Sequence, residues 1–371
     1  MLDSPNIFVT LLAFLLVLGP LVVIHELGHY LVGRIFGVKA DAFSVGFGKE
    51  LAGWTDRRGT RWKLSALPLG GYVQFAGDMN AVSMPDQKED GLTDEERKLT
   101  FHSKPLWQRS LIVLAGPLTN LFFAVAIFAA FNMAYGKVVA TPEIARFGED
   151  SPAQVAGLEI GDRIVAIDGN RIQSFTEIPE YVVPFPGKTV TLTVEREDQS
   201  LEIPVTIAEV VETDSFGNEA RIGRLGIGAD KGELVPVGPI EAVALGFEQS
   251  FGIMKMMVTG IGQIFSGDRS VKELGGPIKI AKYSGEQFSL GWSQFVSFAA
   301  LISINLAFIN LLPIPALDGG HLAFYAAEAV RRKPLGLRSQ EWAFRTGLAL
   351  VLALMLFVTI NDLASLPVFG G

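Results

Sequence analysis

Four long stretches of the chain contain no charged residue, and each approaches the length of a membrane-spanning helix. They cover residues 4–24, 110–136, 287–317 and 346–361. A helix needs about 20 apolar residues to cross the hydrocarbon core of a bilayer. The last stretch is short, but apolar residues resume after Asp362 as far as Phe369, which fits a tilted or terminal span. The pattern predicts a polytopic α-helical membrane protein with about four transmembrane helices.

The first stretch has two interpretations, because a short apolar N-terminal segment can also be a secretory signal peptide. No basic region precedes it, and it runs directly into His25-Glu26-Leu27-Gly28-His29 instead of a small-residue cleavage site. We therefore predict a retained transmembrane helix.

Lysine and arginine are unevenly distributed among the connecting segments. They cluster after the first stretch and after the third, as Arg57, Arg58, Arg61, Lys63, Arg331, Arg332, Lys333, Arg338 and Arg345. Residues 137–240, by contrast, contain 9 Lys/Arg and 18 Asp/Glu. Short cytoplasmic loops carry the excess of positive charge. We therefore predict that both basic connections are cytoplasmic and that the acidic segment and both chain ends lie on the opposite side.

The acidic segment has the pattern of a small α+β domain. Residues 189–194 and 201–207 predict short strands, while Ser151-Pro152-Ala153 begins a short helix. Residues 161–169 then predict a strand followed by a tight Asp-Gly turn. This order of helix, Gly-Asp turn, strand and Asp-Gly turn resembles a PDZ domain.

The PDZ resemblance implies that an extended peptide, such as a C-terminus, binds by strand addition. The candidate loop for that terminus is Leu225-Gly226-Ile227-Gly228. An ordinary glycine-flanked strand is the alternative interpretation of this loop.

Two further segments carry their own patterns. Residues 62–75, which include Leu69, Gly70, Gly71 and Tyr72, alternate apolar residues with turn formers and predict a β-hairpin. Residues 78–109 are polar and predict a solvated excursion. Residues 239–265 have bulky apolar residues at helical intervals, which predicts an interfacial amphipathic helix. The alternative is a helix packed on the PDZ domain.

These patterns divide the chain into eight segments. They are a first transmembrane helix (1–36), a membrane-associated β-hairpin with a polar loop (37–106), a second helix (107–136), a PDZ domain (137–235), an interfacial segment (236–286), a third transmembrane segment (287–320), a basic loop (321–344) and a fourth helix (345–371).

Composition supports the membrane interpretation and limits the chemistry. Hydrophobic residues make up 49% of the chain and charged residues 19%. A net charge of −8 without a basic stripe argues against nucleic-acid binding. Because the chain contains no cysteine and only four histidines, any metal site must use nitrogen and oxygen ligands from a small set.

His25-Glu26-x-x-His29 is the strongest chemical signal in the sequence. Histidines four residues apart lie on one face of a helix, where both can bind one zinc ion, and the intervening glutamate is placed as a general base. Two surface histidines on a helix are the alternative. The motif directly follows an apolar span, however, and ionisable groups in a membrane segment indicate function.

A catalytic zinc site usually has three protein ligands and an open position, so a third ligand is expected elsewhere. Asp318 ends the third uncharged stretch, in Asn310-Leu311-Leu312-Pro313-Ile314-Pro315-Ala316-Leu317-Asp318. The predicted orientation places it at the same depth as His29. The prolines predict an irregular segment, which is tolerated at membrane depth where it lines a protein cavity. A helix-capping aspartate is the alternative.

Three separated motifs resemble those of the site-2 protease family of intramembrane metalloproteases, and in particular its bacterial branch of envelope-stress sigma-factor regulators. They are HExxH at His25–His29, GPxxN at Gly116–Asn120 and NxxPxPxLDG at Asn310–Gly319. The resemblance covers nearly the whole chain. It implies that His25, His29 and Asp318 bind Zn²⁺ and that Glu26 is the general base. It also implies that Asn310 and Asn120 position substrate backbone and that the Leu67–Phe75 hairpin pairs with an unwound substrate.

The same resemblance implies a location in a bacterial inner membrane, with a periplasmic PDZ domain and an active site near the cytoplasmic face. The implied substrate is a single-span membrane protein, such as an anti-sigma factor, or a signal-peptide remnant. Many members of this branch carry two tandem PDZ domains, whereas residues 137–240 have room for one. Roles that depend on a paired module are therefore not carried over.

The remaining histidines and two other functions complete the set of alternatives. His321 is an available fourth ligand, but a closed coordination sphere suits a structural zinc better than a hydrolytic one. His102 lies in the polar loop and is expected to be solvated. A zinc or cation transporter would tolerate Glu26→Gln, and a membrane-anchored PDZ scaffold would tolerate Glu26→Ala.

Overall fold

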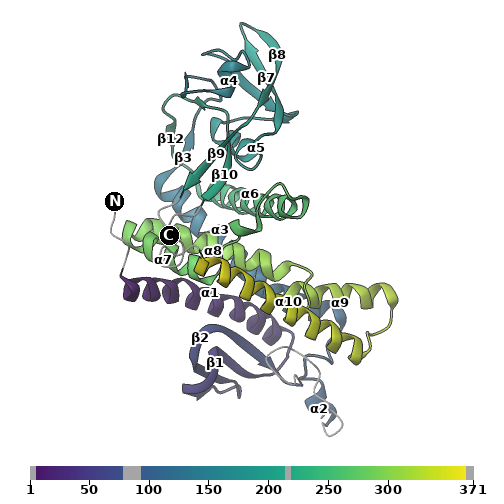
Figure 1. Cartoon of the computed structure of the whole chain (residues 1–371). Helices are drawn as coiled ribbons and strands as arrows, with labels where there is room; N and C mark the ends of the chain where they lie inside the picture. The colour runs from purple at the N-terminus through teal and green to yellow at the C-terminus, as the bar shows by residue number, and fades with distance from the viewer. Residues whose placement is uncertain (1–5, 78–92, 214–218, 365–371) are drawn as a thin grey trace. The chain divides into compact units, whose positions relative to one another are not determined.

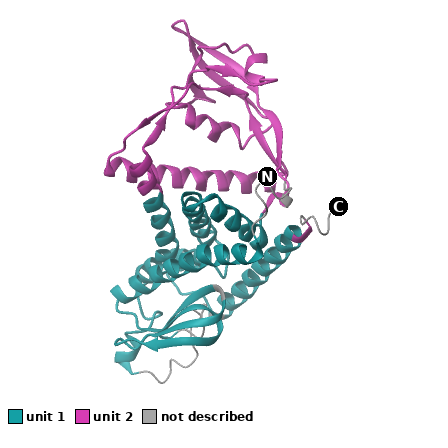
Figure 2. Cartoon of the chain, turned by 90° about the vertical axis from the view of Figure 1, so that its left-hand side faces the viewer, with its two compact units in different colours: residues 1–127, 275–362 teal, residues 128–274, 363–371 magenta. Residues whose placement is uncertain are grey.

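The computed structural model describes residues 6–77, 93–213 and 219–364 of the chain (Figure 1). The chain forms two compact units (Figure 2). Unit 1 contains residues 1–127 and 275–362, and unit 2 contains residues 128–274 and 363–371. Unit 1 holds the membrane helices and a β-hairpin, and unit 2 holds a small α+β domain.

Four helices in the described part of the chain are long and apolar enough to cross a membrane, which confirms the predicted polytopic architecture. They are α1 (Ile7–Ile35), α3 (Leu106–Tyr135), α8 (Trp292–Leu311) and α10 (Leu337–Ala364). Helix α10 begins well before the predicted uncharged stretch, because its first turns accommodate Arg338 and Arg345. The apolar continuation predicted as far as Phe369 lies beyond the described residues, apart from its first part.

Helix α1 runs without interruption from the apolar stretch through the histidine motif. Asn6 caps its first turn by accepting a hydrogen bond from the Phe8 amide at 3.1 Å. The helix ends where Gly37 adopts a left-handed conformation (φ 72°), which glycine tolerates without a steric penalty. The motif residues are therefore fixed on a rigid helix.

The β-hairpin is built from strands β1 (Ala40–Thr55) and β2 (Arg61–Phe75). The prediction that residues 62–75 form a hairpin by themselves is wrong, because they form one strand whose partner precedes them. The turn lies at residues 56–60, where the Asp56 carboxylate accepts hydrogen bonds from the amides of Arg58 and Thr60. The chain therefore reverses direction at Asp56, and the turn-forming residues Pro68-Leu69-Gly70-Gly71 lie within strand β2.

Strand β2 bends so that both of its halves meet the same part of β1. Residues 42–45 pair with residues 61–64 and also with residues 71–74. Left-handed glycines in β1, Gly46 (φ 89°) and Gly48 (φ 88°), accompany the irregular register. The segment from Gly71 to Phe75 consequently lies at the edge of this small sheet, beside α1.

The polar excursion between the hairpin and α3 is described only from residue 93, and residues 78–92 lie outside the described part. It contains a short helix, α2 (Asp94–Arg97), which a Thr93/Glu96 capping box begins. Leu99 and Phe101 then return to the base of the hairpin, where they form backbone hydrogen bonds with Lys39 and Ala76. Phe101 is 1% exposed and belongs to the core, so the excursion is not solvated throughout.

The third predicted membrane segment is divided into separate elements. Helix α7 (Pro277–Leu290) precedes α8, and α9 (Asp318–Arg331) follows it after the irregular residues 312–317. The prediction of a basic loop over residues 321–344 is wrong for most of its length, because α9 and the first turns of α10 occupy it. Glu328 of α9 is 7% exposed and pairs with Arg109 of α3. This pair packs α9 against α3, which partly explains why these residues form a helix and not a loop.

Unit 2 contains an antiparallel four-stranded sheet with the strand order β6-β5-β7-β8. These strands are β5 (Arg163–Ile167), β6 (Asn170–Arg171), β7 (Thr189–Arg196) and β8 (Gln199–Thr206). Buried aliphatic residues of β5 and β7, with Ala153 and Leu158, form its core. The strands and the Asp168-Gly169 turn lie where the sequence predicts them.

Smaller elements complete unit 2. They are the helices α4 (Pro152–Val155) and α5 (Ile178–Val182), and the strand pairs β3 (Lys137–Val139) with β12 (Glu233–Val235), β4 (Arg146–Phe147) with β11 (Ile227–Gly228), and β9 (Ala208–Thr213) with β10 (Glu219–Arg224). Ser151 caps α4 as expected. The Leu225–Gly228 loop contains a left-handed Gly226 (φ 71°) followed directly by β11.

The amphipathic segment forms one long helix, α6 (Pro239–Ser266), which confirms its predicted secondary structure. The Lys255 ammonium lies 5.2 Å from the centre of the Tyr181 ring. The Gln263 side chain donates a hydrogen bond to the carbonyl of Pro184. These contacts support the alternative interpretation, in which the helix packs on the PDZ-like elements of its own unit.

We expect the buried carboxylate of Asp162 to make unit 2 less stable in acid. Asp162 is 1% exposed and accepts charged hydrogen bonds from Arg196 at 2.6 and 2.7 Å. Burial raises the pKa of Asp162, but the Arg196 guanidinium and the Glu159 amide outweigh burial and hold that pKa below its ordinary value. The contribution of the Asp162 carboxylate to the stability of unit 2 is therefore complete above the pKa of Asp162 in the unfolded state. It is lost as the pH falls through the pKa of Asp162 in the folded state.

Asp162→Asn should destabilise unit 2 by about 1–3 kcal/mol near pH 7 and should reduce the loss of stability in acid. Hydrogen exchange of the β5 and β7 amides in the full-length protein, corrected for the intrinsic rate at each pH, measures both effects. Ser200→Asn, at an exposed position in the same domain, is the control. Equal acid sensitivity in wild type and Asp162→Asn would show that this carboxylate is not responsible.

Candidate metal centre and active site

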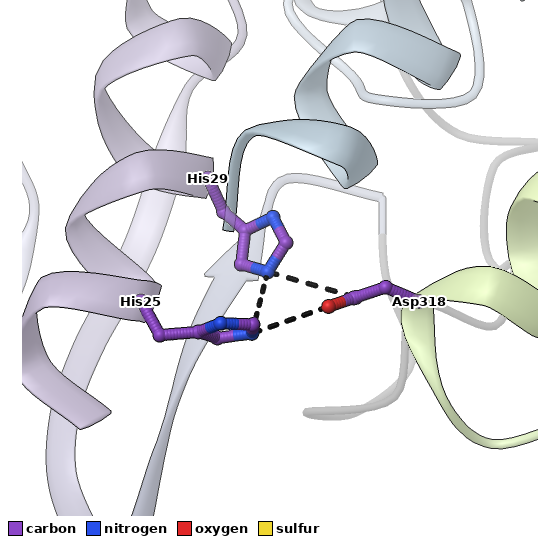
Figure 3. A group of neighbouring side chains, drawn as sticks. All are labelled: His25, His29 and Asp318. Atoms are coloured by element: carbon purple, nitrogen blue, oxygen red, sulfur yellow. Dashed lines mark hydrogen bonds and ion pairs between the residues drawn. The ribbon is translucent and has the colours of Figure 1, made fainter. Parts of the chain in front are cut away.

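Two histidines and an aspartate from distant parts of the sequence meet inside unit 1 (Figure 3). His25 and His29 extend from α1, and Asp318 lies in the first turn of α9. The two imidazole Nε2 atoms are 3.2 Å apart. The Asp318 carboxylate lies 3.2 Å from His25 Nε2 through Oδ2 and 3.6 Å from His29 Nε2 through Oδ1. Among the described residues, these three form the group whose ligand atoms all lie within 4.8 Å of one another.

The donor set fits a zinc ion in both chemistry and dimensions. Zinc–ligand bonds of about 2.0–2.1 Å in a tetrahedron place the ligand atoms roughly 3.3 Å from one another. The 3.2 Å separation of the two Nε2 atoms agrees with this spacing, and each Nε2 lies 3.2 or 3.6 Å from a different oxygen of the Asp318 carboxylate. Two imidazoles and one carboxylate also leave one tetrahedral position for a reacting group, as in hydrolytic zinc sites.

The irregular segment before α9 fixes the direction of the Asp318 side chain. Helix α8 ends at Leu311, and Pro313 and Pro315 prevent it from continuing. Ala316 then adopts a left-handed conformation (φ 84°), which is strained for a residue other than glycine and occurs most often at functional sites. A Cβ at Gly319 or Gly320 would overlap the carbonyls of residues 311–314, so both glycines are needed for the close return of the chain.

Glycines also allow α3 to approach the histidine motif closely. A Cβ at Gly28 of α1 would lie 2.5 Å from the Ala115 carbonyl oxygen of α3. A Cβ at Gly116 of α3 would overlap His29 Nε2 and would lie 2.9 Å from His25 Cε1. Gly116, the first residue of the predicted Gly-Pro-x-x-Asn motif, therefore forms part of the wall around the imidazoles.

Each imidazole has a partner on its outer nitrogen. His29 Nδ1 lies 2.9 Å from the Ile112 carbonyl oxygen, which can only accept, so Nδ1 carries the proton and Nε2 has a free lone pair. His25 Nδ1 lies 3.4 Å from the Asn120 side-chain amide. Such partners orient the ligands of metal sites.

Glu26 lies beside the three ligands and lines a cavity of about 200 Å³. A Cβ at Gly71 of β2 would lie 3.4 Å from Glu26 Cγ, so the edge of β2 lies against the proposed base. The cavity is lined by the ligands together with Glu26, Gly71, Tyr72, Val73, Phe75, Phe101, Ile112, Val113, Asn310, Ala316, Leu317 and His321.

Most of the predicted site residues meet in this one place. His25, Glu26, His29 and Asp318 are together, and Asn310, Gly71 and Tyr72 line the same cavity. Asn120 contacts His25 and is 0% exposed, so it does not line the cavity wall. Gly70 lies next to the cavity in β2 with φ 105°, and the side chain of Leu69 is outside the described part of the structure.

Sequence reasoning missed Phe101 as a cavity residue. It lies in a segment whose neighbours are polar, and a single aromatic residue in such a loop gives no periodic signal. His321 lines the cavity without joining the three-ligand group. Burial lowers the pKa of His321, and the Asp318 carboxylate only partly opposes this, which favours a neutral imidazole.

Two histidines, an aspartate and an intervening glutamate that meet in one cavity of a unit with long apolar helices define the class of membrane-embedded zinc metalloproteases. The profile of peptidase family M50 matches residues 13–354. The chain belongs to this family, the site-2 proteases, and its metal is Zn²⁺.

Relatives of similar length carry the same designation. A protein of Agrobacterium fabrum named as a zinc metalloprotease is 45% identical over 95% of both chains. A protein of Rhizobium meliloti with the same type of name is 44% identical over 96% of this chain and 97% of its own. Metalloprotease MmpA of Caulobacter vibrioides is 36% identical over 97% of both chains.

The PDZ domain of an SdrC-like protein from Listeria innocua aligns with 26% of this chain and 99% of its own, at 24% identity and a TM-score of 0.20.

We expect Gly116→Ala to disrupt the metal centre by steric overlap with both imidazoles. Zinc affinity should fall by at least about tenfold, and proteolysis should fall with it, because the rings must move away from their positions. Competition with a chromophoric chelator measures the affinity. Gly19→Ala is the matched control, since a Cβ at this α1 position has no neighbour within 4 Å. Unchanged zinc affinity in Gly116→Ala would contradict the described packing.

Proposed function

We propose that this protease hydrolyses a peptide bond in the transmembrane segment of a single-span membrane protein. His25, His29 and Asp318 hold the zinc ion in this proposal, and Glu26 is the general base. The observation that supports it best is the approach of three ligand atoms to within 4.8 Å, beside a glutamate, inside a cavity of a membrane unit.

The chemistry that zinc supplies in such a ligand set is Lewis acidity, which acidifies water and polarises a carbonyl. The chain itself contributes the proton transfers. Glu26 accepts a proton from the attacking water and returns one to the leaving amine. Helix α1 and the edge of β2 at Gly71 hold the Glu26 side chain beside the ligands, in the cavity where both transfers take place.

Substrate backbone is proposed to pair with the edge of β2. A helical peptide bond is already hydrogen-bonded internally and sterically covered, so the substrate must unwind before it can be attacked. Gly71, Tyr72 and Val73 present a strand edge to the cavity that can hold an extended segment. Gly70 and Leu69 continue this strand, and Asn310 lines the cavity where its amide can bind a substrate carbonyl.

The proposed substrates are proteins of the anti-sigma-factor type that have already been shortened on their outer side, or signal-peptide remnants. The PDZ domain is proposed to control their access, either by excluding bulky outer domains or by binding a newly exposed C-terminus. The left-handed Gly226 before β11 supports the second role, because successive backbone amides at such a turn can form a concavity that binds a carboxylate.

The location that we propose is a bacterial inner membrane, with the active site near the cytoplasmic face and the PDZ domain in the periplasm. The positive charges at residues 57–63 and 331–345 support a cytoplasmic position for the segments that hold them. The excess of acidic residues between positions 137 and 240 supports the opposite position for that domain.

We expect Glu26→Gln to abolish cleavage and to retain zinc. Glutamine keeps the size of the side chain but cannot accept the proton, and loss of a general base lowers the rate by about 10²–10⁴-fold. Coexpression with a single-span substrate measures cleavage, and zinc is measured on the purified protein. Glu341→Gln, whose side chain is 44% exposed on α10, is the control.

Equal cleavage by wild type and Glu26→Gln would remove the proposed mechanism. Two other outcomes would support other functions. Zinc flux into proteoliposomes that is unchanged by Glu26→Gln would indicate a transporter, and a function that depends only on residues 137–240 would indicate a scaffold.

The topology has its own test, because the chain contains no cysteine and each variant can therefore carry a single thiol. Ser200→Cys in unit 2 and Arg58→Cys in the hairpin turn are both at exposed positions. A membrane-impermeant maleimide should label Ser200→Cys in cells with a permeabilised outer membrane, and should label Arg58→Cys only after the inner membrane is opened. The reverse labelling would invert the proposed orientation.

A further inference from the structure

Asn120 contacts a metal-centre histidine without lining the cavity. Its side chain is 0% exposed, and its Nδ2 atom lies 3.4 Å from His25 Nδ1. Its backbone carbonyl accepts a hydrogen bond from Ser303 Oγ of α8 at 2.8 Å. Asn120 therefore lies between α1 and α8, and its side-chain amide is directed at the outer nitrogen of His25.

The Asn120 amide has one polar atom without a partner. Its Oδ1 atom is buried and accepts no hydrogen bond within the described residues. A buried acceptor that remains unsatisfied costs about 1–3 kcal/mol. The oxygen and the nitrogen of an amide are nearly isosteric, so a half-turn about the Cβ–Cγ bond places Oδ1 against His25 Nδ1.

The two orientations of the amide select different tautomers of His25. An NH₂ group directed at Nδ1 requires a lone pair there and leaves the proton on Nε2, which prevents Nε2 from binding a metal. A carbonyl oxygen directed at Nδ1 accepts a proton from it and leaves the lone pair on Nε2. At His29 the Ile112 carbonyl already selects the second arrangement, at 2.9 Å.

We propose that Asn120 is a positioning residue of the metal centre, whose side-chain oxygen accepts a hydrogen bond from His25 Nδ1 and thereby keeps the His25 Nε2 lone pair directed at the metal. It acts through His25 and does not touch the reacting atoms. Its assignment as a residue that binds substrate backbone is replaced by this role. The inference rests on the proposed function only in that His25 is taken as a zinc ligand.

Asn120→Leu and Asn120→Asp separate this role from a structural one. Leucine removes the acceptor, and zinc affinity should fall by about 10–100-fold, as is typical when the partner of a ligating histidine is lost. Aspartate can accept but cannot donate, and it should keep zinc affinity within about threefold of wild type. Chelator competition on the full-length protein in detergent measures the affinity, and the absorption spectrum of the cobalt-substituted protein reports the ligand geometry.

His25→Ala and Ser303→Ala are the reference variants. His25→Ala should lose zinc, and if it does not, the proposed metal centre fails together with this inference. Ser303→Ala leaves the amide in place, and its zinc affinity should remain within about threefold of wild type.

Three outcomes would overturn the inference alone, with zinc loss in His25→Ala intact. They are wild-type zinc affinity in Asn120→Leu, a loss of tenfold or more in Asn120→Asp, and a higher KM for substrate in Asn120→Leu with zinc affinity unchanged. The last outcome would restore the assignment of Asn120 to substrate binding. If Asn120→Leu does not fold, Asn120→Asp decides by itself, because an amide that donates to His25 would not tolerate the loss of its NH₂ group.

Discussion

A carboxylate and two imidazoles packed within 4 Å of one another, inside a membrane unit, impose the main constraint on this fold. Removing an ion from water costs several kcal/mol even after the protein relaxes, and the cost falls only when a counter-charge is placed with good geometry. Asp318 is 18% exposed, and its carboxylate lies 3.2 and 3.6 Å from the Nε2 atoms of His25 and His29. A divalent cation between the three groups satisfies all of them at once, which makes the cluster stable where a lone carboxylate would not be.

The rest of unit 1 is arranged so that these groups can meet. Membrane helices gain little from the hydrophobic effect when they associate in lipid, and close contact between backbones through small residues takes its place. Gly28 and Gly116 provide that contact between α1 and α3, and Gly319 provides it between α9 and the end of α8. The hairpin adds a strand edge that reaches the base at Gly71. These glycines thus let the helices pack closely and, by doing so, bring the proposed zinc ligands together.

The sequence predicted the membrane helices, the ligands and the strands of unit 2, because each depends on local patterns. An uncharged stretch of membrane length, histidines at helical spacing and alternating apolar residues all report structure within a few neighbouring positions. The strand partner of β2 depends on the turn at Asp56, and α9 depends on the pairing of Glu328 with Arg109, neither of which gives a periodic signal. Phe101 reaches the cavity through backbone hydrogen bonds to Ala76, a contact that its polar surroundings conceal. The contact of Asn120 with His25 depends on helix packing and could not be derived from the motif alone.

The distance along the chain between the ligands has a consequence for biosynthesis. Asp318 follows His29 by 289 residues, and translation at about 5–20 residues per second therefore separates the two by roughly 15–60 s. During that interval the nascent enzyme exposes two imidazoles and a base to the insertion machinery without the carboxylate that completes the site. Catalytic competence consequently begins only after Asp318 of α9 has reached His25 and His29, so an incomplete chain cannot attack the proteins that are inserted beside it.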